Sequence, residues 1–250
     1  TLVLFCALIN AQENYCGASR SKAQISWLKD FQQGKLEKYS ADRNNLKYLP
    51  IKAHIVGRDD GTGYYRLSNL WTQICELNED FEGSGLQFYL DLPLSYLDNT
   101  TFYEHQSYWD INQGVDQTWT YGMVNAYFSK EAAGNCGYFS PSQDVVVLAH
   151  ACTNPGDKTL SHEVGHFFSL PHTFNGWEGG YVPSPNQQEK VNGSNCNYVA
   201  DGFCDTPPDY AYYRWTCPLS DTLIDPNGDT LDVDGSLIMS YSDDACANRF

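Results

Sequence analysis

The stretch that decides the fold is His162-Glu163-Val164-Gly165-His166-Phe167-Phe168-Ser169-Leu170-Pro171-His172. Residues four apart lie on one face of a helix, so His162 and His166 can direct two imidazole nitrogens at one metal ion. Pro171 ends the helix and favours extended geometry in the residue before it, so the chain can turn back and bring His172 as a third ligand. Three histidines leave a fourth position open for water, which is the pattern of a catalytic zinc site.

Glu163 lies about 100° round the helix from His162, beside the metal rather than on it. This position suits a general base that acts on a metal-activated water. The other interpretation is an ordinary amphipathic helix with core or surface histidines. Three of the six histidines of the chain fall within these eleven residues, which favours the metal site.

The motif resembles the metzincin signature H-E-x-x-H-x-x-G-x-x-H, and the chain departs from it at Ser169, where the family has glycine. That glycine usually adopts a left-handed conformation, and serine there costs on the order of 1 kcal/mol. Ile238-Met239-Ser240-Tyr241 resembles the Met-turn beneath the metal in this family. The resemblance implies that Met239 forms the apolar floor of the site and that Tyr241 approaches the metal or the transition-state oxyanion. Taken alone, the turn is better explained as a core methionine and a packed tyrosine, and the histidine motif before it is what favours the Met-turn.

A closer resemblance, over roughly residues 48 to 250, is to the pappalysin and ulilysin family of metzincin zinc metallopeptidases. Besides the histidine motif, the matching pieces are Pro50 to Val56, Leu77 to Phe81, Gly137-Tyr138, Asp144 to Val147, Leu170 to Phe174, Cys204-Asp205-Thr206-Pro207 and Met239-Ser240-Tyr241 with Asp244 and Cys246. This implies an α+β fold: an α/β-like upper half with a twisted mixed sheet and the active-site helix, and a loop-rich lower half crosslinked by disulfides. The strand at 137–139 would be the sheet edge that pairs with an extended substrate.

The hydrophobic pattern predicts strands at 49–56, 86–92, 123–128, 138–139 and 145–148, and a helix with a buried apolar stripe over 67–81. After Pro171 the sequence is rich in Gly, Asn and Pro and predicts irregular chain.

Residues 1–11 form an apolar run that ends in a small residue, which is typical of a secretory signal peptide remnant. A buried N-terminal strand is the alternative. We expect residues 12–48 to be a pro-segment and 49–250 to be the metzincin catalytic domain, truncated at its C-terminal end by comparison with the family. The signal predicts a secreted, extracellular protein.

Nine cysteines also favour an exported chain, and removal of Cys6 with the signal leaves an even set of eight. Composition and spacing do not determine the pairing. The family resemblance implies two interleaved bridges and leaves a third: Cys196 with Cys217, Cys204 with Cys246, and Cys136 with Cys152. Cys75, on the flank of the apolar stripe, is expected to be a free and buried thiol.

Cys16 stands in Asn14-Tyr15-Cys16-Gly17. Members of the family carry a Cys-Gly in the pro-segment whose thiolate binds the zinc and displaces the water, so the resemblance makes Cys16 a candidate latency ligand. The protein would then be a zymogen, with Arg43 and Lys47 as candidate cleavage points. A disulfide between Cys16 and Cys75 is the alternative.

The net charge of −16, from 31 acidic and 15 basic residues, opposes binding to nucleic acid or to an anionic membrane. The expected partner is a protein or peptide substrate, and the sequence gives no oligomeric state. The resemblance places Asp243 and Asp244 at the wall of the first pocket beyond the scissile bond, where they would favour Arg or Lys. It also implies structural calcium (Ca²⁺), for which oxygen ligands are available at Asp225, Asn227, Asp229, Asp232 and Asp234; a solvated acidic loop is the alternative.

The sequence therefore predicts a secreted zinc (Zn²⁺) metalloendopeptidase that hydrolyses peptide bonds with a metal-activated water and Glu163 as general base. One alternative is a non-catalytic, zinc-containing extracellular binding module. A structural site of that kind normally closes with a fourth protein ligand. A zinc hydrolase that acts on something other than peptides is the other alternative, and the products of turnover would distinguish it.

Overall fold

The computed structural model describes residues 14–17, 22, 26, 29, 30, 33, 35 and 46–250. The expected signal remnant 1–11, much of the expected pro-segment and Arg43 lie outside the described residues. In the part of the chain that is described, no helix has the length and apolar character needed to cross a membrane.

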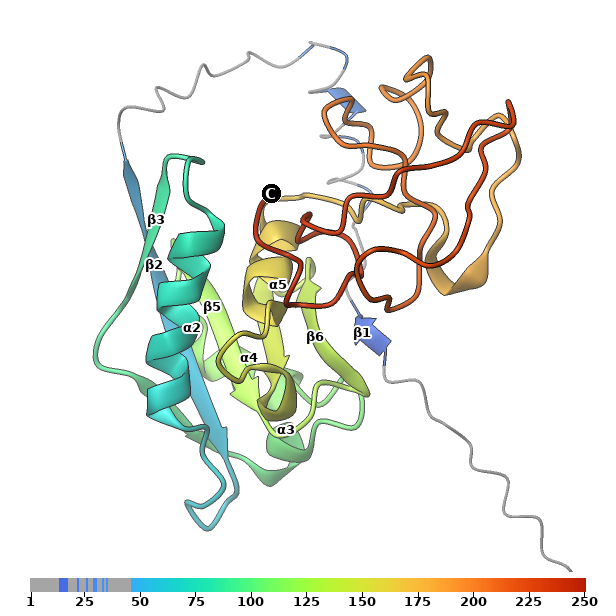
Figure 1. The fold of residues 1–250 in the computed structure, drawn as a ribbon. Helices are drawn as coiled ribbons and strands as arrows, with labels where there is room; N and C mark the ends of the chain where they lie inside the picture. Colours follow the sequence, from blue (N-terminus) through green and yellow to red (C-terminus); the bar gives the residue numbers. More distant parts are fainter. Residues whose placement is uncertain are drawn as a thin grey trace, which may run out of the picture.

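One mixed sheet forms the upper half, and its strand order is β1-β6-β7-β5-β2-β3, with β4 also paired to β2 (Figure 1). The strands are β1 (Asn14–Cys16), β2 (Lys47–Gly57), β3 (Leu86–Leu90), β4 (Ser95–Asp98), β5 (Val124–Ser129), β6 (Asn135–Ser140) and β7 (Val145–Ala149). All neighbouring pairs are parallel except β6 and β7, which are antiparallel. The expected mixed sheet is confirmed, and β2 begins at Lys47, two residues before the predicted start. Lys47, a candidate cleavage point, is therefore paired within the sheet, opposite Leu86.

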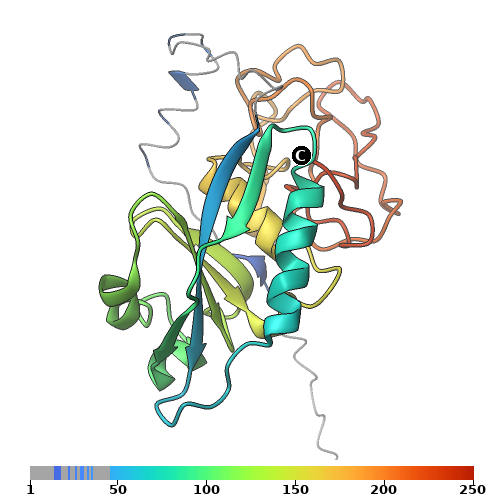
Figure 2. The same ribbon diagram turned by 90° about the vertical axis from the view of Figure 1, so that its left-hand side faces the viewer.

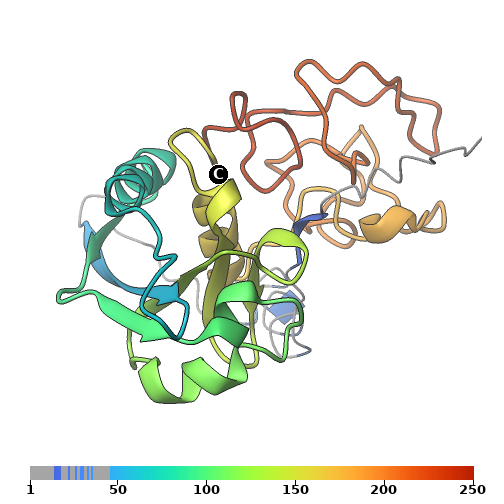
Figure 3. The same cartoon turned by 90° about the horizontal axis from the view of Figure 1, so that it is seen from below.

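The central strands are continuous apolar runs because helices and loops cover both faces of the sheet. Every residue of β7 is buried, and its side chains alternate between two cores. Val146 and Leu148 face helices α2 (Leu67–Asp80) and α5 (Thr159–Phe167), whereas Val145 and Val147 face α3 (Thr100–Glu104) and α4 (Asn112–Thr118). Figure 3 shows these two pairs of helices on opposite sides of the sheet.

Helix α2 buries the predicted stripe of Leu70, Ile74 and Leu77 and lies along β3 (Figure 2). Cys75 lies outside that stripe, so its thiol is free but exposed, and the expectation of a buried thiol is wrong. At the end of α2, the buried Asp80 accepts hydrogen bonds from Lys158 Nζ at 2.7 Å and Ser161 Oγ at 2.5 Å. These contacts connect α2 to the start of α5, the helix that carries the histidine motif.

The part expected as the lower half, coloured orange to red and drawn at the upper right of Figure 1 with the sheet at the lower left, is mostly irregular chain between residues 168 and 250, as predicted. The Cys136–Cys152 disulfide is confirmed. The interleaved pairing is wrong, because the remaining bridges are Cys196–Cys204 and Cys217–Cys246.

The local turns of the chain explain this disulfide pairing. Two tight turns reverse the chain between Cys196 and Cys204, and their Cα atoms lie 5.1 Å apart, within disulfide reach. Trp215 forms a bridge with Ser242, which brings Cys217 beside the segment that contains Cys246.

Candidate metal centre

Helix α5 carries His162 and His166 on one face, and their side chains are 0% and 4% exposed. The helix ends at Phe167, and Ser169 follows with a φ of +68°. This is the left-handed conformation expected where the family has glycine. Leu170 N–H then bonds the carbonyl of Gly165 at 3.0 Å, and the reversed chain brings His172 back to α5.

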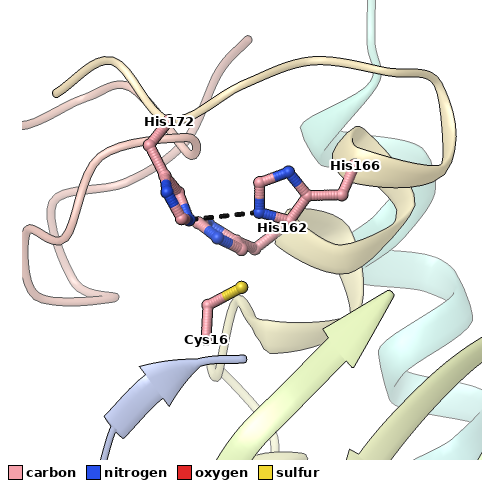
Figure 4. Close-up of side chains that lie close together, drawn as sticks. All are labelled: Cys16, His162, His166 and His172. Carbon is pink, nitrogen blue, oxygen red and sulfur yellow. Dashed lines mark hydrogen bonds between the residues drawn. The ribbon is translucent and has the colours of Figure 1, made fainter. Parts of the chain in front are cut away.

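Four side chains converge at this point: Cys16, His162, His166 and His172 (Figure 4). Their ligand atoms all lie within 4.8 Å of one another, and the Nε2 atoms of His166 and His172 are 3.1 Å apart. Tetrahedral nitrogen and sulfur ligands of zinc lie about 3.3–3.8 Å apart. Among the described residues, this is the one group of three or more potential ligands that could hold a metal ion.

The other ring nitrogen of each helix histidine bonds the main chain. His162 Nδ1 lies 2.7 Å from the carbonyl oxygen of Ile238, and His166 Nδ1 lies 2.8 Å from that of Leu170. Carbonyl oxygens only accept, so both Nδ1 atoms donate. This fixes the tautomer in which Nε2 offers its lone pair to a metal.

His172 is oriented by a side chain instead, because its Nδ1 lies 3.3 Å from Glu178 Oε1. The Nε2 atom of His162 is buried and has no hydrogen-bond partner. A buried lone pair without a partner is costly unless a ligand satisfies it, so these residues fit a zinc ion. Burial, with the electrostatic effect of the neighbouring His172 imidazole second, lowers the pKa of His162 to about 3 and keeps it neutral, as a ligand must be.

Glu163 is fully buried beside the histidines. Burial raises its pKa to about 8, and the nearby Cys16 thiol and Phe139 main chain oppose that rise. Gly137 on β6 allows α5 to approach this closely, because a Cβ there would lie 2.8 Å from Thr159 Cγ2 and 3.0 Å from Glu163 Cγ.

Met239 lies under α5, as predicted for a Met-turn. A Cβ on Gly165 would lie only 2.4 Å from Met239 Sδ, so the methionine packs directly on the helix main chain between the two histidines. Tyr241 also lies at the site, with its ring centroid 5.1 Å from that of His172 and its hydroxyl 3.4 Å from the Cys16 carbonyl. Burial raises the pKa of Tyr241, so it is a hydrogen-bond donor at neutral pH.

Asp209 is a structural residue of the site that sequence reasoning missed. Its Oδ2 accepts from Thr173 Oγ1 at 2.6 Å and from Ser240 Oγ at 2.8 Å, and it is buried. Asp209 thereby joins the segment after His172 to the Met-turn. It stands two residues after the Cys204-to-Pro207 match, but a single aspartate in a loop carries no periodic signal.

Strand β1 pairs in parallel with β6, Cys16 opposite Gly137, and Gly17 N–H bonds the Gly137 carbonyl at 2.9 Å. Strand β1 therefore covers the sheet edge on which we expected a substrate to pair. The alternative Cys16–Cys75 disulfide is absent, because Cys16 lies at the histidines and Cys75 on the exposed side of α2.

Two of the five candidate calcium residues, Asp225 and Asp234, stabilise turns. Asp225 accepts main-chain hydrogen bonds from Val191, Asn227 and Asp229, and Asp234 accepts from Ser236 and Arg249. These carboxylates cap turns, and within residues 46–250 no group of them meets the geometry of a metal site.

Known proteins resemble the chain in sequence. Residues 144–250 match the model of peptidase family M43, described as pregnancy-associated plasma protein-A. An extracellular metalloprotease of Pyricularia oryzae is 27% identical over 235 residues, covering 84% of this chain and 73% of the relative. An extracellular metalloprotease of Arthroderma benhamiae is 28% identical over 267 residues, covering 97% and 88%.

Solved structures show the same fold. A mutant of promirolysin from Tannerella forsythia superposes with a TM-score of 0.63 at 18% identity, covering 95% of this chain and 90% of that one. Mature mirolysin from the same organism, in complex with a cleaved peptide, gives a TM-score of 0.57 at 20% identity, with coverage of 82% and 87%.

Proposed function

We propose that the chain is an extracellular endopeptidase of the pappalysin family of metzincin zinc metallopeptidases and that it is made in a latent form, which the match of residues 144–250 to the M43 model and the similar extracellular metalloproteases support. His162, His166 and His172 hold the zinc ion, Glu163 is the general base, and Cys16 occupies the fourth ligand position until the pro-segment is removed. The observation that carries the proposal is the convergence of these four ligand side chains, with the buried, unpartnered Nε2 of His162 among them.

Zinc, when bound, lowers the pKa of water, polarises a carbonyl group and favours the ionised form of nearby Glu163. Glu163 takes one proton from the water that attacks the scissile carbonyl carbon, and later gives it to the leaving amine as the C–N bond breaks. The Tyr241 hydroxyl donates a hydrogen bond to the oxyanion of the tetrahedral intermediate. Its position beside His172 supports this role.

A peptide substrate binds in extended form along the edge of β6, with main-chain hydrogen bonds of the kind that Gly17 makes to Gly137. Since β1 occupies that edge, substrate and pro-segment compete for it. The protein is therefore kept inactive in two ways: Cys16 occupies the fourth ligand position, and β1 blocks the sheet edge to which a substrate would pair.

The test is zinc content and casein hydrolysis of the full chain before and after limited trypsin treatment, with a chelator control. We expect one equivalent of zinc in both forms and chelator-sensitive hydrolysis only after cleavage. One equivalent of zinc with no proteolysis in either form would contradict the proposal and favour a zinc-containing binding module.

A further inference from the structure

The side chain of Tyr15 fills a pocket immediately beside the metal centre. Its ring packs edge-on against His162 and Tyr241, with centroid distances of 5.3 and 5.2 Å. The Arg214 guanidinium lies 4.3 Å above the ring centroid, and the Tyr15 hydroxyl donates to Asp244 Oδ1 at 3.1 Å. Successive residues of a strand point to opposite sides, so Cys16 reaches the histidines while Tyr15 enters the lower half.

Arg214 offsets one of the two negative charges that Asp243 and Asp244 bring to this pocket. Its Nη2 lies 2.8 Å from Asp244 Oδ1, its Nε lies 3.7 Å from Asp243 Oδ1, and its Nη1 donates to the Ser242 carbonyl. A lysine or arginine side chain that entered the pocket would meet this guanidinium instead of a free carboxylate. The expectation that Asp243 and Asp244 favour basic residues therefore does not fit the geometry.

The same arrangement suits a tyrosine. A planar guanidinium, oriented by Asp244 and the Ser242 carbonyl, offers its face to an aromatic ring. Two aromatic rings complete the walls in edge-to-face geometry. Asp244 Oδ1 accepts a hydrogen bond from the phenolic hydroxyl, so the pocket favours a side chain that has a hydroxyl group as well as an aromatic ring.

We propose that the pocket lined by His162, Arg214, Tyr241 and Asp244 is a side-chain subsite that selects tyrosine over basic residues, and that Arg214 is its specificity-determining residue. Tyr15 occupies the subsite in the latent protein as a substrate side chain would in the active one. The selection of tyrosine in a substrate rests on the proposed function. The contact of Tyr15 with Arg214 does not, and it can be tested without measuring peptide hydrolysis.

The first experiment measures how fast a thiol reagent labels Cys16 in the zinc-loaded full chain, in a background carrying Cys6→Ser and Cys75→Ser, which removes the other two cysteines outside the three disulfides. Tyr15→Arg sets two guanidinium groups against each other, so we expect labelling to accelerate roughly tenfold. Adding Arg214→Ala frees Asp243 and Asp244 to pair with the new arginine and should return the rate towards that of the parent. Arg214→Lys keeps the charge and should not rescue.

The matched control is Lys130→Ala, which removes an exposed basic residue paired with Glu104 in the upper half and should not change the labelling rate. Circular dichroism and the melting temperature identify any variant that has lost its fold. Equal labelling of all variants, or strictly additive effects of Tyr15→Arg and Arg214→Ala, would overturn the inference.

The second experiment gives the trypsin-activated protein, after trypsin has been inhibited and removed, an equimolar mixture of peptides that differ only by Tyr, Phe or Arg at one position beside the scissile bond. The ratio of competing substrates does not depend on the fraction of the protein that has been activated. We expect Tyr to be cleaved roughly tenfold faster than Arg, and Arg214→Ala to reverse that order. An unchanged ratio in Arg214→Ala would overturn the inference. If no peptide were cleaved, that result would count against the proposed function instead. The labelling rates of Cys16 in the first experiment would still test the contact between Tyr15 and Arg214.

Discussion

At the scale of single residues, the metal centre depends on hydrogen bonds that orient each ligand. Main-chain carbonyls fix His162 and His166, and Glu178 orients His172. Since each of these bonds uses Nδ1, all three Nε2 atoms are directed to one point. Glu163 contributes a carboxyl group at the same point without being one of the converging ligands.

Replacement of the general base should separate metal binding from catalysis. We expect Glu163→Gln to keep one equivalent of zinc and to lower peptide hydrolysis about 10²- to 10⁴-fold, because no side chain is left to move the proton. Zinc analysis and a casein assay on the activated protein check this, with the exposed Glu79→Gln on α2 as control. Hydrolysis at the parent rate by Glu163→Gln would refute the assignment.

Loss of the third ligand should act on the metal itself. His172→Ala leaves two histidines, so we expect zinc to dissociate at chelator concentrations that the parent protein withstands, and activity to fall with it. A chelator titration followed by zinc analysis measures this. Full zinc occupancy in His172→Ala under those conditions would exclude His172 as a ligand.

Ser169 occupies a conformation that favours glycine, with a φ of +68°. Ser169→Gly relieves that strain, so we expect the free energy of unfolding to rise by up to about 1 kcal/mol with zinc content unchanged. Urea denaturation of the two proteins checks it, and a lower midpoint for Ser169→Gly would show that the serine side chain contributes more than the strain costs.

The buried Glu189 side chain should make the free energy of unfolding depend on pH. Burial, with the charges of Asp201 and Asp209, raises its pKa to about 8. The folded protein therefore keeps a proton on Glu189 that the unfolded chain releases near about pH 4.3. The contribution of this protonated carboxyl to the free energy of unfolding is complete below about pH 4 and is lost as the pH rises to about 8. We expect Glu189→Gln to flatten the decline between pH 5 and 8, by at most about 1.4 kcal/mol per pH unit. Denaturation midpoints that decline equally in both proteins would contradict this.

At the scale of elements, the position of α5 depends on its contacts with α2 and β6. Asp80 joins the two helices, and Gly137 permits the close approach of the strand. We expect Asp80→Asn to lower the free energy of unfolding by about 3 kcal/mol, because it leaves the Lys158 ammonium partly buried and unpaired. The exposed pair of Lys130 and Glu104 is the control, and Lys130→Ala should cost less than about 1 kcal/mol. Thermal and urea denaturation measure both, and equal effects would show that the Asp80 contact is not special.

Elements with a strong local pattern were predictable from the sequence. The stripe of Leu70, Ile74 and Leu77 predicted α2, and the β-branched run of β7 predicted a buried strand. Helix α3 has five residues and β4 has four, which is too short for a hydrophobic period to be recognised. Strand β1 exists only through its pairing with a strand more than a hundred residues away, and no local pattern encodes such a contact.

The convergence of His162, His166 and His172 was predictable because helix spacing and a proline turn bring them together along one short stretch. Two disulfides were predicted wrongly, since the pairing followed a resemblance and not the local turns that bring Cys196 to Cys204. Arg214 was missed because its role depends on Asp243 and Asp244, about thirty residues further along the chain, and on Tyr15 far before it.

At the scale of the whole molecule, the upper sheet and the irregular lower half meet at the histidines, and residues 14–17 lie between them. Cys16 contacts the metal centre, Gly17 pairs with β6, and Tyr15 packs against Arg214 in the lower half. The proposed latency would therefore depend on both halves, and removal of residues 14–17 would expose the ligand position, the sheet edge and the subsite together.

The most direct test of this account is X-ray absorption at the zinc edge of the zinc-loaded full chain, before and after removal of the pro-segment. The account predicts three nitrogen ligands at about 2.0 Å and one sulfur ligand at about 2.3 Å in the latent protein. After cleavage, the sulfur signal should be replaced by a light-atom ligand as hydrolysis appears. A spectrum without sulfur in the latent protein, or with sulfur that persists in an active one, would contradict the account.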